Sequence, residues 1–346
     1  MRSKAPLRRK KPALGRVHSS VVNAAKLVDR RSTLYSASSD AGHRGATTPV
    51  VVDAVIVAYN SRDTLRACVE SLVEFPWVSV TVVDNASPDD SAAVVADLPI
   101  RTIKAPRNGG FAYGCNLGTA GGAAEFVLLL NPDARVEAPS LRTLVSALRA
   151  DPSLGSVGPR TFGDGGRLHC TQRRFPRLLS TYGQALGLHR IAPLSSLADE
   201  VKEPAAYERP ATPDWLSGGC VLLRRTALDQ VGGLDEGFFL YSEETDLFRR
   251  LRSRGWRARF EPRAIAYHRG SASAPRELTD PILARSRVRY ARKHHGAVVA
   301  LLEAVGVSID AVARAAVWSH RPARRRGHLA AARAALGAVR SSGRTG

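Results

Sequence analysis

The amino-acid sequence predicts an α/β protein with a Rossmann-like, mostly parallel central sheet flanked by helices. Three apolar runs, at residues 50–57, 78–83 and 126–130, are typical of buried strands, and a further strand is predicted around residues 100–104. Helical segments separate these predicted strands, and such alternation indicates parallel strands with right-handed crossovers. Turn-forming residues follow the runs, which places the carboxyl ends of the strands at one edge of the sheet.

The first strand, residues 50–57, ends at Tyr59-Asn60-Ser61, and Ser61 is a candidate N-cap for the next helix. That helix is predicted from apolar residues at helical spacing, namely Leu65, Cys68, Val69, Leu72 and Val73. The second strand, residues 78–83, ends at Asp84, and a short helix is predicted over residues 90–96. A third strand near residues 100–104 precedes a helix that begins near Tyr113.

The fourth strand passes directly into Asn131-Pro132-Asp133. Pro132 cannot continue a central ladder, so the strand ends there and Asp133 lies at the sheet edge. One carboxylate at such an edge suits a divalent cation that substrate phosphates also hold. Asp84 ends the second strand at the same edge. The alternative is that both residues only form turns or cap helices.

The second half of the chain has a less regular pattern. Its predicted elements are a helix at 139–151, a strand at 155–159, loops at 160–213 with some helix at 177–188, a strand at 220–224 and a helix at 225–231. Glu243, Glu244 and Asp246 open a helix that runs to about residue 254, and the helix dipole favours acidic side chains in that first turn. Three carboxylates beside Tyr241 nevertheless exceed what a helix start requires. Two short strands, at 256–260 and 264–267, lead to His268.

Residues 297–318 are apolar but contain Glu303, Asp310 and Arg314, which makes a membrane-spanning helix a weak prediction. One helix face would carry their large apolar side chains, namely Val298, Leu301, Leu302, Val305, Ile309, Val312 and Trp318. Such a helix fits equally on a bilayer surface or against its own domain.

The net charge of +20 lies mostly in the two ends of the chain. Residues 1–48 carry 11 Lys and Arg against two acidic residues, residues 320–346 carry seven Arg and no acid, and +4 remains for residues 49–319. An anionic membrane surface is the partner expected for these ends, and we expect no nucleic acid; solvated arms are the alternative. Four widely spaced cysteines give neither a zinc pattern nor a disulfide framework, which fits a reducing cytoplasm.

Several short motifs occur in a characteristic order between about residues 50 and 295. They are Val57-Ala58-Tyr59-Asn60, Asp84-Asn85-Ala86-Ser87, Arg107-Asn108-x-Gly-Phe111, Asn116-x-Gly118, Asn131-Pro132-Asp133, Trp215-x-Ser-Gly-Gly219, Gly233-x-Asp235-x-x-Phe-Phe239, Glu243-Glu244-x-Asp246 and His268. Each motif alone is weak, but the ordered set resembles the inverting family-two glycosyltransferases of the GT-A fold, and within them the rhamnosyltransferase-like branch.

The resemblance implies an inverting, metal-dependent transfer of a sugar, with rhamnose favoured, in cell-envelope polysaccharide synthesis. The donor would be a dTDP- or UDP-linked sugar, and the acceptor a hydroxyl of a glycan or a lipid-linked glycan. A catalytically degenerate protein that only binds a nucleotide sugar or a partner is the alternative. A dinucleotide-dependent oxidoreductase is disfavoured, because no Gly-x-Gly-x-x-Gly follows the first strand.

The resemblance also implies where the donor binds. The turn at Ala58 and Tyr59 would hold the nucleotide, and Asp84 would accept a hydrogen bond from the pyrimidine base. Arg107 and Asn108 would lie near the base and the phosphates. Asn131 stands where the family's Asp-x-Asp signature has its first Asp, so we expect it at the nucleotide sugar rather than on the metal.

Asp133 and His268 match positions that bind a divalent metal, Mg²⁺ or Mn²⁺, on the donor diphosphate. Glu244 is the expected catalytic base, with Glu243 as the second candidate, because the family has Glu-Asp where this chain has Glu-Glu. The departure leaves full activity open. The residues expected to line the acceptor side are Trp215, Ser217, Gly218 and Gly219.

The patterns predict four regions of the chain. They are a disordered basic arm at 1–48, the transferase domain at 49–295, an amphipathic helical extension at 296–319 and a basic tail at 320–346. Within the domain, residues 49–135 would bind the nucleotide and residues 136–295 the acceptor. We expect a cytoplasmic protein that lies peripherally on the inner face of the plasma membrane.

Overall fold

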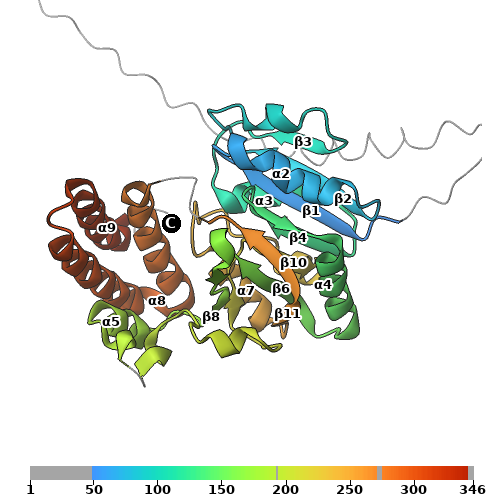
Figure 1. Cartoon of the computed structure of the whole chain (residues 1–346). Coiled ribbons are helices and arrows are strands. Elements are labelled where there is room, and N and C mark those ends of the chain that lie inside the picture. The colour runs from blue at the N-terminus through green and yellow to red at the C-terminus, as the bar shows by residue number, and fades with distance from the viewer. Residues whose placement is uncertain (1–48, 192–193, 271–274, 342–346) are drawn as a thin grey trace, which may run out of the picture. The chain divides into compact units, whose positions relative to one another are not determined.

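The computed structural model describes residues 49–191, 194–270 and 275–341, so the predicted basic arm at 1–48 lies outside the described residues. A nine-stranded sheet occupies the centre of the described part (Figure 1). Its strands are β1 (Val52–Ala58), β2 (Val78–Asp84), β3 (Arg101–Lys104), β4 (Phe126–Leu130), β5 (Ala134–Val136), β6 (Leu154–Phe162), β7 (Leu168–His169), β10 (Cys220–Arg224) and β11 (Arg257–His268). The order across the sheet is β3-β2-β1-β4-β10-β6-β11-β5, and β7 pairs with β6.

The pairing directions confirm an α/β fold with a mostly parallel sheet. Strands β3, β2, β1 and β4 run parallel, β10 lies antiparallel between β4 and β6, and β11 is parallel to β6. Ala58 pairs with Asp84, and Ile56 pairs with Leu130. The turns after β1, β2 and β4 therefore meet at one edge of the sheet, as the sequence predicts.

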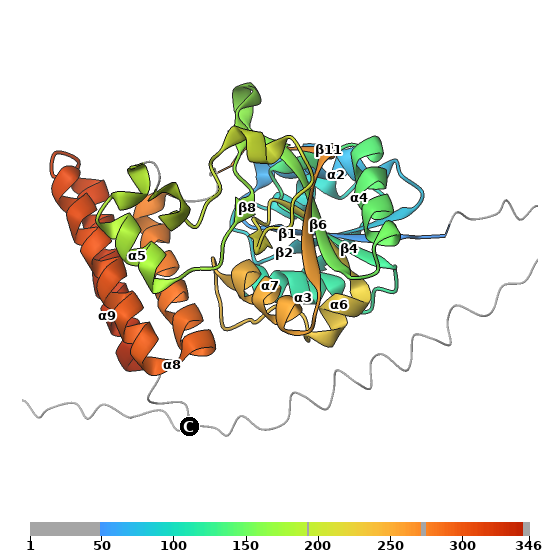
Figure 2. The ribbon, with the colours of Figure 1, turned by 90° about the horizontal axis from the view of Figure 1, so that it is seen from below.

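Helices cover both faces of the sheet (Figure 2). They are α2 (Arg62–Val73), α3 (Phe111–Thr119), α4 (Ala138–Ala150), α6 (Arg225–Gln230) and α7 (Glu243–Ser253). On one face α2 and α4 bury Leu65 and Leu144 against alternate strand residues such as Ile56. On the other face α3, α6 and α7 pack in a second cluster that includes Val55 and Leu247. Burial on both faces explains the continuously apolar central strands.

The structure differs from the prediction at the last strand. Residues 257–268 form one strand, β11, where the sequence predicts two, and the pairing register with β6 shifts between Glu261 and Ile265. The buried Glu261 carboxylate accepts hydrogen bonds from Arg263 Nε at 2.8 Å and Arg259 Nη2 at 2.9 Å. This bulge hides strand continuity from a period-two pattern. The predicted short helix at 90–96 is the 3₁₀ helix η1 (Ser91–Val95).

The C-terminal residues form a small helical bundle. Helix α8 (Arg276–Val317) bends at Gly296, which has φ 86° and ψ 179°. Arg287 Nε lies 2.9 Å from Glu303 Oε1, a contact between residues 16 positions apart that requires the chain to reverse at the bend. We call residues 276–295 and 297–317 the first and second arms of α8. The bend coincides with the predicted boundary at 296, although the domain limits stay a prediction.

Helix α9 (Pro322–Ser341) packs along α8. Ala331, Ala332 and Ala335 share a buried cluster with Ala284 and Ala304 of the two arms. The alternative of a solvated C-terminal arm is therefore wrong for residues 322–341. Alanines pack closely, but they give no helical spacing of large apolar residues. For this reason the sequence analysis did not predict this helix.

A further short helix supports the second arm of α8. Helix α5 (Leu178–Ala185) packs there, where Tyr182 Oη donates to the Leu302 carbonyl at 2.9 Å. By length and composition α8 qualifies as a candidate membrane span, and 28% of its most apolar stretch is buried in the fold.

Candidate functional site

The carboxyl ends of β1 and β2 form the first part of the site. Asn85 donates its backbone N–H to the Ala58 carbonyl at 2.9 Å, and Asp84 Oδ1 accepts the Ser87 N–H at 2.8 Å. The Asn85 side chain then holds the next loop, since its Nδ2 donates to Asn108 Oδ1 at 3.1 Å and to the Gly110 carbonyl at 3.0 Å. These contacts join three of the quoted motifs, those at residues 57–60, 84–87 and 107–111, in one hydrogen-bonded group.

Asn85 is a residue to which sequence reasoning assigned no role. Its Oδ1 also accepts the Gly109 N–H at 3.2 Å, so one buried amide connects the β2 turn with the loop before α3. The signal was present, because Asn85 belongs to one of the quoted motifs. Only the tertiary contact shows that it organises the loop on which Asn108 lies.

The end of β4 meets the end of β11. Asp133 Oδ1 lies 3.0 Å from His268 Nε2, and Asn131 Nδ2 lies 3.3 Å from the same nitrogen. The two predicted metal ligands, 135 positions apart in the chain, are therefore neighbours. Burial raises the pKa of Asp133, but the hydrogen bond and charge of His268, together with backbone N–H groups such as that of Gly270, hold this pKa below its usual value.

Gly218 and Gly219 connect this pair with the predicted base. A Cβ at Gly219 would lie 2.8 Å from His268 Nδ1, and the Gly219 carbonyl accepts the Asn131 N–H at 3.1 Å. A Cβ at Gly218 would lie 1.9 Å from Glu244 Oε1. The backbone at Gly218 and Gly219 therefore lies closely packed between the carboxylate of Glu244 and the Asp133–His268 pair, and we call it the Gly218-Gly219 passage.

The two glutamates at the start of α7 differ in exposure. Glu243 is buried, with 3% exposure, and its Oε2 has no hydrogen-bond partner among the described residues, whereas Glu244 is half-buried. Burial and the neighbouring Glu244 charge raise the pKa of Glu243 well above its usual value. Burial raises the pKa of Glu244 to about 7, against the opposing effects of the Gly218 N–H, Arg173 and His268. A carboxyl group that titrates near neutrality is suited to accept a proton.

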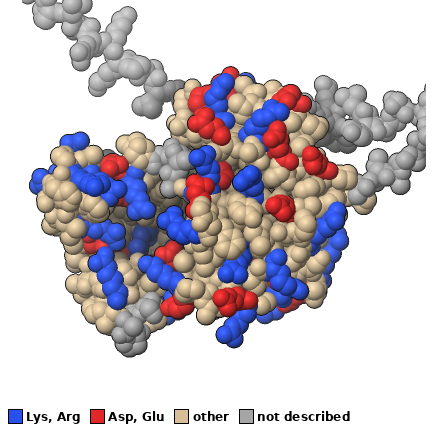
Figure 3. Space-filling view, viewed as in Figure 1, with Lys and Arg blue, Asp and Glu red and all other residues tan. Residues whose placement is uncertain are grey.

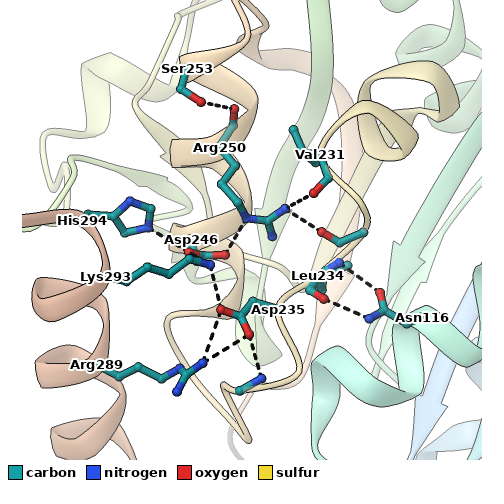
Figure 4. A network of polar contacts seen from close by, with 12 residues as sticks. Asn116, Val231, Leu234, Asp235, Asp246, Arg250, Ser253, Arg289, Lys293 and His294 are labelled. Carbon is teal, nitrogen blue, oxygen red and sulfur yellow. Dashed lines mark hydrogen bonds and ion pairs between the residues drawn. The ribbon is translucent and has the colours of Figure 1, made fainter. Parts of the chain in front are cut away.

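The start of α7 is held in a strained conformation. Tyr241 and Ser242 have φ values of 67° and 65°, which side-chain-bearing residues seldom adopt. The fully buried Asp246 carboxylate anchors the helix: Arg250 Nε and Lys293 Nζ each lie at 2.7 Å and His294 Nε2 at 2.8 Å (Figure 4). These partners hold the pKa of Asp246 at about 2 although burial raises it.

The loop before α7 contacts the start of α3. Phe111 donates its N–H to the Phe239 carbonyl at 2.9 Å, and a Cβ at Gly110 would lie 2.0 Å from that oxygen. Asp235, in the same loop, pairs with Lys293 Nζ at 2.7 Å (Figure 4). The loop therefore connects the start of α3 with the first arm of α8.

Four predicted site residues lie outside these contacts. Tyr59 is 40% exposed and Arg107 lies on the surface, with Cζ 5.0 Å from the Tyr113 ring centre. Trp215 lies half-buried against the core in β9 (Trp215–Leu216), and its indole N–H donates to the Arg174 carbonyl at 3.0 Å. Ser217 donates its N–H to the Thr171 carbonyl at 3.0 Å.

Comparisons with known proteins decide the family. The profile of Glycosyl transferase family 2 matches residues 53–232. The chain belongs to glycosyltransferase family 2. The matched range contains the β1, β2 and β4 turns and the Gly218-Gly219 passage.

Relatives support the assignment of this glycosyltransferase. It is 31% identical over 273 residues to an N-acetylglucosaminyl-diphospho-decaprenol L-rhamnosyltransferase of Mycobacterium tuberculosis, covering 71% of this chain and 86% of that protein. An O-antigen biosynthesis protein of Myxococcus xanthus is 30% identical over 240 residues, 65% of this chain and 18% of that protein. This glycosyltransferase is an enzyme of nucleotide-sugar chemistry and polysaccharide biosynthesis.

A solved structure supports the fold of this glycosyltransferase. The mannosyltransferase of Pyrobaculum calidifontis in complex with GDP-Man and Mn²⁺ superposes with a TM-score of 0.50 at 16% identity, over 93% of this chain and 96% of that one. The GT-A fold expected from the sequence is confirmed. That neighbour holds Mn²⁺, whereas the described residues here contain no cluster of three His, Cys, Asp or Glu that could hold a metal.

Proposed function

We propose that this glycosyltransferase moves a sugar, with rhamnose favoured, from a nucleotide diphosphate onto a hydroxyl of a glycan or lipid-linked acceptor, with inversion. The observation that carries the proposal is the Glu244 carboxylate, which lies across the Gly218-Gly219 passage from the Asp133–His268 pair. The 31%-identical rhamnosyltransferase supports the choice of sugar and of a diphospho-lipid acceptor.

The donor would lie along the carboxyl ends of β1, β2 and β4. Asp84, with 8% exposure, would accept a hydrogen bond from the pyrimidine base, which suits a dTDP- or UDP-linked sugar. Ala58, Tyr59, Arg107 and Asn108 would surround the nucleotide, and the Asn85 amide would keep Asn108 in place. The anomeric carbon would then lie near Asn131, between the two halves.

The residues at the β4 end fit a divalent cation. Asp133 supplies a carboxylate and His268 an imidazole, and their contact at 3.0 Å supports a shared role. Two protein ligands suffice for Mg²⁺ or Mn²⁺ when diphosphate oxygens complete the shell. Such an ion would neutralise negative charge that develops on the leaving diphosphate.

Glu244 would act as the general base. It would take the proton of the acceptor hydroxyl as that oxygen attacks the anomeric carbon on the face opposite the diphosphate, which inverts the centre. Glu243 is less suited, because its buried carboxyl favours the protonated form. Ser217, Gly218, Gly219 and the aromatic face of Trp215 would line the acceptor side.

A catalytically degenerate protein is the second candidate, and the Glu-Glu sequence favours it. A Glu in place of Asp reaches one methylene further, and in this structure its carboxylate fills the space over Gly218 rather than pointing away. This placement supports an active enzyme.

The expected location is the cytoplasm, at the inner face of the plasma membrane. The acceptor of the mycobacterial relative is, by its name, a diphospho-decaprenol, and lipids of this kind remain in the bilayer. The basic ends of the chain would be attracted to an anionic leaflet.

A panel of nucleotide sugars, each with Mn²⁺ or Mg²⁺, tests the function. A donor that binds the native state raises its melting temperature, and dTDP-rhamnose should give the largest shift. Transfer to a polyprenyl diphosphate acceptor and hydrolysis of the donor are then measured together. A metal-dependent shift without transfer or hydrolysis would favour the degenerate alternative, and no shift with any donor would contradict both.

A further inference from the structure

The second arm of α8 leaves an apolar face without a partner among the described residues. Its inner face, at Ala300, Ala304, Ala311 and Ala315, is buried in the bundle. Six large aliphatic side chains with exposures between 38% and 73% form what we call the apolar stripe: Val298, Leu301, Leu302, Val305, Ile309 and Val312. At about 100° per residue, these six fall within roughly a third of the helix circumference, with no charged residue among them.

The bundle places its large side chains outside and its small ones inside. The buried cluster among the three helices is composed of Val288 and eight alanines, namely Ala284, Ala291, Ala300, Ala304, Ala311, Ala331, Ala332 and Ala335. A helix bundle that faces only water has the opposite arrangement. Small residues between helices and large aliphatic ones outside are typical of helices whose outer face meets lipid.

Positive charge adjoins the stripe. Residues 311–341 contain seven Arg and no Asp or Glu: Arg314, Arg321, Arg324, Arg325, Arg326, Arg333 and Arg340. Trp318, at the turn between α8 and α9, has the guanidinium carbons of Arg321 and Arg324 at 5.3 and 4.4 Å from its ring centre. Among the charged side chains over α8 and α9, those visible in Figure 3 are mostly Lys and Arg. Trp with Arg is favoured where hydrocarbon meets an anionic headgroup layer.

We propose that the apolar stripe and the Trp318–Arg321–Arg324 turn form a surface that docks on an anionic lipid bilayer, with the second arm of α8 lying in the interface plane. The proposal deepens the membrane location proposed above by assigning it to this surface. It does not depend on which sugar is transferred.

The contacts of the second arm favour lying on the bilayer over crossing it. Glu303 is 4% exposed, and its carboxylate binds Arg287 Nε at 2.9 Å and Thr181 Oγ1 at 2.6 Å. A Cβ at Gly306 would lie 2.8 Å from Thr181 Cγ2, so α5 covers this side of the arm. A spanning helix would have to break these contacts and carry Glu303 into hydrocarbon, which is costly.

The first arm of α8 connects the docking surface to the site. Lys293 and His294 bind the Asp246 carboxylate at the start of α7, and Arg289 lies 3.4 Å from Asp235 (Figure 4). Docking would therefore hold the helix that bears Glu244 at a set position relative to the bilayer, which suits an acceptor with a lipid anchor.

Sedimentation of the full chain with phosphatidylcholine vesicles, with and without phosphatidylglycerol, tests the proposal. We expect the chain to sediment with the anionic vesicles. The double substitution Leu301→Gln/Val305→Gln should weaken this partition by about tenfold or more, because it removes exposed apolar surface without adding charge. Arg321→Gln/Arg324→Gln should weaken it at low salt and leave a salt-resistant remainder. Ile265→Gln, at a 37%-exposed position on β11, is the matched control and should sediment like the unaltered chain.

Unchanged melting temperatures establish that the variants fold. Partition that is unaffected by the stripe substitution, or equally weakened by Ile265→Gln, would overturn the proposal. A concentration-dependent oligomer that the stripe substitution dissolves, without vesicle binding, would assign the stripe to a second copy of the chain instead. Retention on vesicles through both high salt and alkaline carbonate would mean that α8 spans the membrane. Each failure leaves the donor-binding and transfer tests unaffected.

Discussion

Substitution of Gly218 by Ala should displace the base without unfolding the protein. The added Cβ would lie 1.9 Å from Glu244 Oε1. Non-bonded heavy atoms stay at roughly 3.5 Å, so this oxygen has to move by about 1.5 Å. The obstructed atom is the end of a flexible side chain, and Gly218 does not have a left-handed φ. We therefore expect a change of less than about 1 kcal/mol in the free energy of unfolding.

The expected effect on turnover is much larger. A displacement of about 1 Å of a reacting group costs about 100-fold in rate, so kcat for Gly218→Ala should fall by about 100-fold or more. That factor corresponds to about 2.7 kcal/mol in the activation barrier. Steady-state transfer with saturating donor measures kcat, and calorimetric titration should show unchanged donor affinity. Gly337→Ala in α9 is the matched control, because a Cβ there meets nothing within 4 Å.

A second substitution separates the proposed route from a general disturbance. If Gly218→Ala acts through Glu244, it should cause no further loss in the Glu244→Gln background, because the two changes remove the same interaction. Wild-type kcat in Gly218→Ala, or a full additional loss in the double variant, would refute the assignment of Glu244 as the base.

Three further predictions follow from the site and from the anchor of α7. Glu244→Gln should lower kcat by roughly 100-fold or more at constant donor affinity; unchanged turnover would move the role to Glu243. With the pKa of Glu244 at about 7, kcat/KM of the unaltered enzyme should rise with pH through about 7. Because of the same raised pKa, the folded state retains a proton that the unfolded state releases near pH 4.5. The free energy of unfolding, measured in urea, should therefore decrease from about pH 4.5 to 7, and it should decrease less steeply in Glu244→Gln. An equal pH dependence of this free energy in both chains would contradict the prediction. Asp133→Ala should abolish the metal-dependent thermal shift with the donor while the fold is retained, and a persisting shift would exclude this residue as a ligand. Asp246→Ala should lower the free energy of unfolding, measured in urea, by about 3–5 kcal/mol, because Arg250 and Lys293 lose their buried counter-charge. In the unaltered chain the pKa of Asp246 is lowered to about 2, so the stabilisation by this carboxylate should be lost between about pH 4 and 2.

The sequence by itself determined the sheet and its functional edge. Apolar runs that end at Asp84 and at Asn131-Pro132-Asp133 identify strands, and their alternation with helices indicates a parallel sheet. Strand-ending residues and the spacing of apolar residues are local properties of the chain, so the sequence alone shows them. The ordered motifs determined the family, because each motif keeps its place relative to the others. These inferences need no contact between distant residues.

Only the tertiary structure decided which side chains meet. The contact of Asp133 with His268 depends on the pairing of β5 with β11, in which Ala134 lies opposite His268, and the placement of Glu244 over Gly218 depends on the packing of α7. No local pattern encodes such long-range packing.

The burial of the C-terminal helices also depends on long-range packing that the sequence pattern does not encode. The apolar pattern at 297–318 fits a buried face and an exposed face equally well, because amphipathicity does not say which partner covers a helix. The fold decides the matter by packing alanines of α8 and α9 against one another, which leaves Leu301 and Val305 on the outside. Burial is a property of the packed chain as a whole, and for that reason this face could be recognised only in the structure.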